Sequence, residues 1–421
     1  MKKSAKIICL LAALSTSAMY VGCFGCNGCG DTMDDGSVKL TVWVSEADKP
    51  FATEVAEEFK KANPDKNYTF TIDIQGENET ATRVLKDVEN AADVYSFPND
   101  QIAKLVNGDA LTKIAGDRLT TIEAENDENA MRSAKATVNG EEGVYGIPYT
   151  DNTFFLYYNK SVLTEEDVKT VDGILAKCSD TKKFAFPMTD GWYTTSFYFG
   201  KDLGYEVTYD ESLAETSIKC DFDGEMGQAV TQAMWEIVQN TKCKPDANDS
   251  KITAGFNDGS IVAAATGIWN RSAIESYLGD NFAVAKLPTY TFNKGAANEE
   301  QVQMVSFAGY KLMGVNNYSK NKADALAFAE FYTNKENQIK HFEMRGYVPT
   351  NLEARQDEGV QADVCAKAIT EQLKYSKPQI NVPSTLWVPM EGLGNSMITA
   401  LQSGSFDLQA QLKACVDAIK K

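Results

Sequence analysis

Apolar and polar residues alternate with two different periods from residue 38 onward, and this alternation predicts strands and helices in turn. The segments KLTVWV (39–44) and TFTIDI (69–74) place apolar side chains at every second position, which is typical of half-buried strands. Between them, residues 52–59 place alanine, valine and phenylalanine at helical spacing. A second helix is predicted over residues 81–90, and a short strand over 93–97.

The same order of strand and helix recurs in the rest of the chain. Residues 143–159 predict two strands joined by a turn, whereas 182–200 and 260–279 each predict a strand, a tryptophan-bearing turn and a helix. Residues 322–334 again carry apolar side chains at helical spacing. Strands that alternate with helices indicate an α/β fold with mostly parallel sheets.

Ligands of such sheets bind at the loops beyond the carboxyl ends of the strands. We therefore expect residues 45–49 and 97–101 to lie together at the mouth of one ligand-binding cleft, at the carboxyl edge of the sheet. Aromatic side chains also stand beside polar ones at three predicted strand ends. These pairs are Phe97 with Asp100, Trp192 with Asp190, and Trp269 with Asn270 and Arg271.

Aromatic residues of this kind have two interpretations. Any one of them can pack in the core, where most aromatic side chains lie. Carbohydrate sites, however, need flat aromatic faces for the C–H faces of sugar rings and polar groups for their hydroxyls. Three such pairs in turns favour a carbohydrate site.

The first 37 residues have a pattern of their own, typical of exported proteins. Three lysines precede a short apolar run at residues 7–14, and small and polar residues then lead to Cys23. The run is too short to span a membrane, and no later segment has 18 uninterrupted apolar residues. The sequence therefore predicts an exported protein without a membrane span. Residues 24–37, rich in Gly and Asp, predict a flexible tether.

Cys23, Cys26 and Cys29 have the spacing C-x-x-C-x-x-C. Three interpretations are open: lipid attachment at Cys23, thiols without a role, and a metal or cluster site. The flanking residues predict no strand or helix that could hold metal ligands. The stretch before Cys23 resembles a bacterial lipoprotein signal, with Gly22 fitting the pattern and Tyr20 departing from it. Lipid attachment is therefore favoured.

Composition excludes several classes of function. The 421-residue chain has a net charge of −18, which argues against nucleic acid as a partner because phosphate binding needs a basic face. The single histidine, His341, argues against a zinc site or a Ser-His-Asp triad, and we expect it to be structural or exposed. Five cysteines follow the tether, so at least one is free. They are Cys178, Cys220, Cys243, Cys365 and Cys415.

From residue 38 to the C-terminus, the chain resembles the solute-binding proteins of bacterial ABC sugar importers, most of all the maltose/maltodextrin-binding family. The resemblance is carried by LTVWVSEADKPF, DVYSFPNDQIAKLVNGDALTKI, GIPYTDNTFFLYYNKSVL, FNDGSIVAAATGIWNRSAI and AFAEFYTNKENQ with RGYVPTN. It implies an exported lipoprotein held at the outer face of the cell membrane, a monomer that binds an oligosaccharide and delivers it to a membrane permease.

The resemblance also implies a set of ligand-binding residues, no catalytic residue, no cofactor and no metal. The implied ligand-binding residues are Asp48, Lys49, Phe97, Asp100, Asn152, Asp190, Trp192, Trp269 and Trp387. Gln101 stands where the family has an arginine and is not among these residues. Asn152 stands where the family has an acidic residue. Trp387 is assigned as a replacement from a neighbouring loop.

The fold implied by the resemblance has two α/β lobes, each a mostly parallel sheet flanked by helices, with the ligand cleft between them. Residues 1–22 would be the signal peptide and 23–37 the tether. The N-terminal lobe would comprise 38–150 and 305–346, and the C-terminal lobe 154–300 and 352–421. Hinge crossings are expected near 150–154, 300–305 and 347–351.

Alternatives remain open. A secreted glycosidase would also have a groove of aromatic and acidic residues, although it needs two carboxylates at a set separation. The sequence shows no P-loop, G-x-S-x-G or zinc motif. A surface adhesin or sensor is a further alternative. Among oligosaccharides, α-1,4-glucans are favoured, with xylo- and galacto-oligosaccharides as the other ligands.

Overall fold

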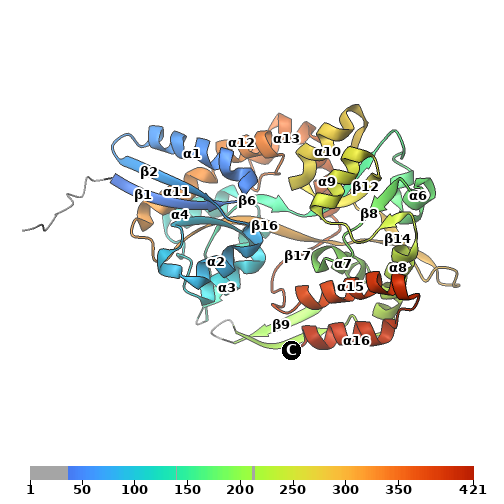
Figure 1. The fold of residues 1–421 in the computed structure, drawn as a ribbon. Coiled ribbons are helices and arrows are strands. Elements are labelled where there is room, and N and C mark those ends of the chain that lie inside the picture. The colour runs from blue at the N-terminus through green and yellow to red at the C-terminus, as the bar shows by residue number, and fades with distance from the viewer. Residues whose placement is uncertain (1–36, 139, 211–213) are drawn as a thin grey trace, which may run out of the picture.

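The computed structural model describes residues 37–138, 140–210 and 214–421, and these form two lobes that lie side by side (Figure 1). The expectations for the signal peptide, the tether and Cys23 lie outside the described residues. Each lobe is built around one sheet with helices packed on its faces. The two-lobed α/β architecture predicted from the sequence is confirmed.

The first lobe contains a six-stranded sheet in the order β17-β16-β3-β1-β2, with β6 also paired to β16. Its strands are β1 (Ser37–Val44), β2 (Asn67–Ile74), β3 (Val94–Pro98), β6 (Ile147–Asn152), β16 (Ser306–Val315) and β17 (Ser376–Pro378). β1 is parallel to β2 and β3, whereas β16 is antiparallel to β3 and β6.

Helices and a small hairpin complete this lobe. They are α1 (Lys49–Ala62), α2 (Thr80–Lys86), α3 (Ile102–Asn107), α4 (Asp117–Glu125), α5 (Glu128–Ser133), α11 (Lys322–Tyr332) and α12 (Lys335–Arg345), with the hairpin β4 (Lys135–Val138) and β5 (Glu141–Val144). Short 3-10 turns are η1 (Glu46–Asp48), η2 (Glu77–Glu79), η3 (Val88–Asn90) and η4 (Asn99–Gln101).

The second lobe contains a five-stranded sheet in the order β11-β8-β12-β7-β13. Its strands are β7 (Phe154–Asn159), β8 (Lys183–Ala185), β11 (Cys243–Lys244), β12 (Ile261–Gly267) and β13 (Phe282–Ala285). β8 is parallel to β11 and β12, but β7 is antiparallel to β12 and β13. This sheet is more mixed than expected because β7 enters it from the first lobe and runs against its neighbours.

Helices and two hairpins surround the second sheet. The helices are α6 (Val171–Lys177), α7 (Gly191–Phe199), α8 (Glu225–Gln239), α9 (Asp249–Asp258), α10 (Arg271–Leu278), α13 (Glu358–Ala362), α14 (Val364–Leu373), α15 (Trp387–Ser403) and α16 (Leu408–Ile419). The hairpins are β9 (Tyr205–Tyr209) with β10 (Glu215–Cys220), and β14 (Thr289–Phe292) with β15 (Glu300–Gln303). The 3-10 turns are η5 (Asp167–Lys169), η6 (Ile268–Asn270), η7 (Gly279–Asn281) and η8 (Ala354–Gln356).

The first helix shows how the apolar spacing produces the packing. Its buried side chains are Phe51, Ala52, Val55, Ala56 and Phe59. They lie on one face because they recur every three or four residues. Pro50 lies in the first turn, where its missing N–H removes no helical hydrogen bond. The buried face of α1 thus packs on the first sheet and fixes the loop that precedes it.

Thr153 is the single residue between β6 of the first sheet and β7 of the second. Its hydroxyl donates a hydrogen bond to the carbonyl of Phe307 at 2.7 Å and lies 2.9 Å from the hydroxyl of Ser306. Two of the segments that join the lobes therefore run side by side.

A third segment, residues 347–351, lies against the first. The N–H of Asp151 donates to the carbonyl of Val348 at 3.1 Å, and the Asp151 carboxylate lies 2.8 Å from the Arg355 guanidinium. Burial raises the pKa of Asp151 to about 6 although Arg355 opposes the shift. β17 lies within 352–421, the range expected for the second lobe, and pairs with β16.

The cysteines in the described part of the chain are all buried and unpaired. Burial raises the pKa of the Cys178 and Cys220 thiols to about 11, and that of the other three to about 12. Over the same residues, no helix is long and apolar enough to cross a membrane.

The packing of α15 depends on a glycine. A Cβ at Gly394 would lie 1.8 Å from the carbonyl oxygen of Met188, a backbone atom that cannot rotate away. Gly394→Ala is expected to lower the free energy of unfolding by about 1–3 kcal/mol, measured by chemical denaturation. Gly392 is the matched control because nothing lies within 4 Å of its Cβ position. Gly392→Ala should stabilise the protein by up to about 1 kcal/mol, and equal effects of the two changes would contradict this packing.

Candidate functional site

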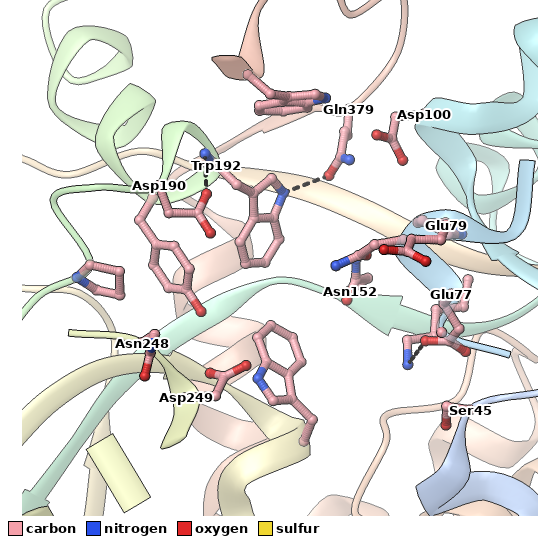
Figure 2. Close-up of a pocket in the computed structure, with 18 of the residues that line it drawn as sticks. Ser45, Glu77, Glu79, Asp100, Asn152, Asp190, Trp192, Asn248, Asp249 and Gln379 are labelled. Atoms are coloured by element: carbon pink, nitrogen blue, oxygen red, sulfur yellow. Dashed lines mark hydrogen bonds and ion pairs between the residues drawn. The ribbon is translucent and has the colours of Figure 1, made fainter. Parts of the chain in front are cut away.

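A cleft of about 850 Å³ lies between the two sheets. Its walls come from the loops that follow β1, β2 and β3 in the first lobe and β8, β11 and β12 in the second. The carboxyl ends of the parallel strands of both sheets therefore face one another, which is where α/β sheets bind ligands. Figure 2 shows polar side chains from both lobes turned toward this space.

The second lobe provides the aromatic wall of the cleft. Its members are Trp192, Tyr193, Trp269 and Trp387. The Trp192 ring lies 5.9 Å from that of Trp269, centroid to centroid, at an interplanar angle of 45°. Behind Trp192, the ring of Phe154 lies at 4.8 Å, so the platform is backed by the core. Such rings are large, rigid contact surfaces for an apolar ligand face.

Local structure explains where two of these tryptophans stand. Asp190 caps α7, and its carboxylate accepts a hydrogen bond from the Trp192 N–H at 2.8 Å, which places Trp192 in the first turn. Trp269 lies in η6, directly after the buried strand β12. A Cβ at Gly267 would lie 2.0 Å from the Trp269 ring, so glycine is needed for this approach.

Carboxylates lie between the aromatic residues. Burial raises the pKa of Asp190, the Trp192 N–H opposes this, and the charges of Asp249 and Glu391 raise it further. Asn248 caps α9, and Asp249 accepts hydrogen bonds from Asn270 at 2.7 Å and Thr266 at 3.2 Å. These acceptors lie beside flat rings, as a sugar site requires.

A buried charge pair forms part of the first-lobe wall. Lys311 Nζ lies 2.6 Å from the Glu77 carboxylate, donates to the Tyr347 hydroxyl at 3.1 Å, and lies 4.3 Å from the Tyr347 ring centroid. Burial lowers the pKa of Lys311, but the negative charges of Glu77 and Asp48 and the hydrogen bond to Glu77 outweigh it, so the pKa is raised overall. The cation is thus held by the protein itself.

Asp100 is the most perturbed carboxylate of this wall. Burial raises its pKa to about 7, against the opposing hydrogen bonds from its own N–H and from Gln379. One of its oxygens, Oδ1, is buried without a hydrogen-bond partner. The indole Nε1 of Trp269 likewise has no partner. Both residues line the cleft, so it contains an acceptor and a donor that the protein leaves unused.

The raised pKa of Asp100 predicts a pH dependence of stability. Between its unfolded value of about 3.9 and about 7, the folded protein binds more protons than the unfolded chain. Stability should therefore fall as the pH rises from about 4 to 7. The raised pKa of Asp151 should lower stability in the same direction, up to about pH 6. We expect a lower Tm at pH 8 than at pH 5, and a smaller difference in Asp100→Asn. An unchanged difference in that variant would contradict the assignment.

Six of the nine residues expected at the site line the cleft. They are Asp100, Asn152, Asp190, Trp192, Trp269 and Trp387. Lys49, the first residue of α1, is exposed and does not line the cleft. The expectation for Phe97 is corrected by burial, because all five residues of the central strand β3 are buried and the Phe97 side chain is 0% exposed.

Asp48 also differs from the expectation. Its carboxylate is 1% exposed and lies 3.3 Å from His341 Nε2 and 3.2 Å from Arg345 Nε. Burial would raise its pKa, but the hydrogen bond and charge of His341, with Lys311 and Arg345, hold it well below its usual range. Asp48 is therefore an internal counter-ion, and His341 is structural as predicted.

Several cleft residues were not predicted from the sequence. They include Glu77, Asn78, Glu79, Tyr193, Asn248, Asp249, Lys311, Arg345, Tyr347 and Gln379. Glu77–Glu79 follow the carboxyl end of β2, so the rule used for β1 and β3 could have found them. Asn248 and Asp249 follow β11, whose two residues give no periodic signal. Among the described residues, no His, Cys, Asp and Glu side chains cluster as metal ligands.

Comparisons with known proteins agree with this geometry. The family model of the bacterial extracellular solute-binding proteins matches residues 54–368. The maltooligosaccharide ABC transporter solute-binding lipoprotein of Streptococcus pneumoniae serotype 4 is 25% identical, over 100% of this chain and 97% of its own. The galactooligosaccharide-binding protein of Bacillus subtilis strain 168 is 25% identical, over 78% of this chain and 76% of its own.

A solved structure with acarbose resembles the whole fold. It has a TM-score of 0.80 and 31% sequence identity, and the match covers 91% of this chain and 99% of the other.

Proposed function

This chain belongs to the bacterial extracellular solute-binding proteins, and from that membership we propose that it captures maltodextrins, α-1,4-glucans longer than a disaccharide, for an ABC importer. Members of the family bind solutes, and the chain is a binding protein rather than an enzyme. The observation that carries the proposal is the row of aromatic rings interleaved with carboxylates and amides in one cleft.

The chemistry of the cleft supports a neutral, hydroxyl-rich ligand. The two cations in its walls, Lys311 and Arg345, are paired with Glu77 and Asp48 respectively. An anionic ligand would thus find no unpaired cation there among the described residues, whereas hydroxyl groups would find many acceptors. Aromatic faces at three tryptophans support a ligand with several rings rather than one.

The relatives favour an α-1,4-glucan but also support a second candidate. Maltooligosaccharide is named for the pneumococcal relative, and acarbose is named for the solved structure described above. The Bacillus subtilis relative is named for galactooligosaccharides, which makes these the alternative ligand. Asn152 and Gln101, which depart from the maltodextrin pattern, both line the cleft and fit either candidate.

A titration of tryptophan fluorescence with a panel of sugars tests the proposal. Maltotriose and longer maltodextrins should change the emission with a saturable response, because three of the five tryptophans line the cleft. Galacto- and xylo-oligosaccharides are the comparison ligands. A response to either of these without a response to maltotriose would refute the maltodextrin assignment, and release of shorter sugars beyond stoichiometry would refute pure binding.

Lobe closure around the ligand is the mechanism that we propose. A ligand held between the lobes favours the closed form only through its greater affinity for that form. The proposed lobes are 38–150 with 305–346 and 154–300 with 352–421, except that β17 joins the first sheet, and the proposed hinges lie near 150–154, 300–305 and 347–351. The side-by-side crossing segments at Thr153 and Ser306 support these hinge positions.

The cellular setting is also part of the proposal. Residues 1–22 would direct export, Cys23 would carry the lipid anchor at the outer face of the membrane, and residues 23–37 would be the tether. The monomeric protein would then present the closed, loaded form to a membrane permease. The pneumococcal relative, which is named a lipoprotein, supports this arrangement.

A further inference from the structure

Gln379 lies in the cleft directly after β17, and its backbone is held on both sides. Its N–H donates to the carbonyl of Ala308 at 3.0 Å, and its carbonyl accepts a hydrogen bond from the Asn99 side chain at 2.6 Å. The residue is only 3% exposed, so its side chain has little freedom. This position was not predicted from the sequence, and no role follows from the contacts described so far.

The Gln379 amide lies between one side chain of each lobe (Figure 2). The indole Nε1 of Trp192, on the second lobe, donates to Gln379 Oε1 at 2.9 Å. An indole N–H can only donate, so the amide oxygen must face Trp192. The amide nitrogen is then turned away from Trp192, and Gln379 is one of the groups that lower the pKa of Asp100, on the first lobe, against the larger effect of burial. Figure 2 shows the Gln379 amide between these two side chains.

The floor of the cleft leaves room for this amide at one position. A Cβ at Gly309 would lie 2.7 Å from Gln379 Oε1 and 3.0 Å from the carbonyl oxygen of Asn152. Glycine at 309 therefore permits the amide to occupy the space between Trp192 and Asp100. The arrangement depends on two independent sequence positions, Gly309 on β16 and Gln379 after β17.

We propose that Gln379 is a positioning residue for the ligand, because the two ends of its amide hold the Trp192 ring and the Asp100 carboxylate in one fixed arrangement across the lobes. Trp192 then offers the ligand its ring face alone, since its N–H is already bonded. Asp100 offers the ligand its oxygen Oδ1, which has no hydrogen-bond partner in the protein. A ligand that satisfies both must present an apolar ring face beside a hydroxyl group, as a pyranose does. This role in ligand binding rests on the proposed function, whereas the arrangement of the two side chains does not.

Two substitutions at Gln379 separate the two ends of the amide. Gln379→Leu removes both the acceptor and the donor at similar size. Gln379→Glu keeps an acceptor for Trp192 but replaces the donor to Asp100 with a like charge. Gly309→Ala displaces the amide without changing its chemistry. Gln411→Leu, at an exposed position on α16, is the control and should leave every measurement below unchanged.

The first measurement needs no ligand. In protein labelled with ¹⁵N-tryptophan, the Trp192 indole signal is assigned with Trp192→Phe. In the wild type, its N–H should exchange slowly with solvent and its shift should titrate with a midpoint near pH 7, as Asp100 does. In Gln379→Leu and Gly309→Ala the exchange should be about tenfold faster or more. In Gln379→Glu the slow exchange should remain, while the midpoint moves to higher pH.

The second measurement is the affinity for maltotriose as a function of pH. Gln379→Leu should weaken binding by about tenfold and move the midpoint of its pH dependence upward, because the lost donor no longer favours the ionised form of Asp100. A purely structural role would lower affinity equally at every pH and leave the midpoint in place, and that result would overturn the proposal.

The two proposals fail in different ways. Unchanged indole exchange in folded Gln379→Leu would overturn the positioning role, whichever sugar binds. If no sugar of the panel binds the wild type while the indole signals change as expected, the proposed function fails and the positioning of Trp192 by Gln379 stands.

Discussion

Trp269→Ala should weaken maltotriose binding by roughly 30-fold or more, a loss of about 2 kcal/mol or more. Trp269 lines the cleft beside Trp192 and follows the buried strand β12, so it presents a rigid ring to the ligand. Truncation removes the ring face and leaves a water-filled gap beside Trp192. Binding is measured by isothermal titration calorimetry, with thermal unfolding as a check on the fold.

Trp43→Ala is the matched control for this prediction. Trp43 is a half-buried tryptophan on β1 of the first lobe and does not line the cleft. Its loss should leave the affinity within about twofold, because substitutions outside an interface contribute little to binding. Comparable losses of affinity in the two variants would mean that the aromatic wall is not the ligand surface.

Asp48→Ala should lower the free energy of unfolding by about 3–5 kcal/mol, because removing one partner leaves buried charge without compensation. Asp48 is the internal counter-ion between Arg345 and His341, and Ser45 donates to its other oxygen at 2.9 Å. Chemical denaturation measures the loss. Because the pKa of Asp48 is depressed, its stabilisation is present above about pH 4 and is lost as the pH falls below it.

Asp65→Ala controls for the removal of a negative charge from this acidic chain. Asp65 lies exposed in the turn after α1, and its loss should change stability by no more than about 0.5 kcal/mol. If Asp48 acted mainly as a direct sugar ligand, its variant would instead keep the stability of the wild type and lose affinity alone. That pattern would contradict the structure described for Asp48.

Local sequence signals predicted the cleft where a strand runs directly into a helix or turn. Trp192 and Trp269 follow this pattern, each in the first residues after a strand-to-helix transition, and both line the cleft. Trp387, assigned without a clear motif, also lines it as the first residue of α15. For Trp192 and Trp269 the local backbone path brings the side chain to the cleft.

Long-range packing explains the positions that the sequence did not predict. Phe97 belongs to a strand that is paired on both sides. The apolar pattern does not distinguish an aromatic side chain buried in the core from one that lines the cleft. The partners of Asp48 on α12 are almost three hundred residues away in the chain. Gln379 and Trp192 are 187 residues apart. Such contacts exist only once distant segments of the chain have packed together.

The single-residue connection at Thr153 has a mechanical consequence for the proposed closure. In any rotation about an axis, displacement grows with distance from that axis. Asn152, next to the connection, and Phe154, which backs the Trp192 ring at 4.8 Å, lie close to it and would travel little. Residues farther from this connection would move through a longer arc. In the open protein, the residues at the base of the cleft would then keep their arrangement. A sugar chain would bind there first, before the outer parts of the two lobes close around it.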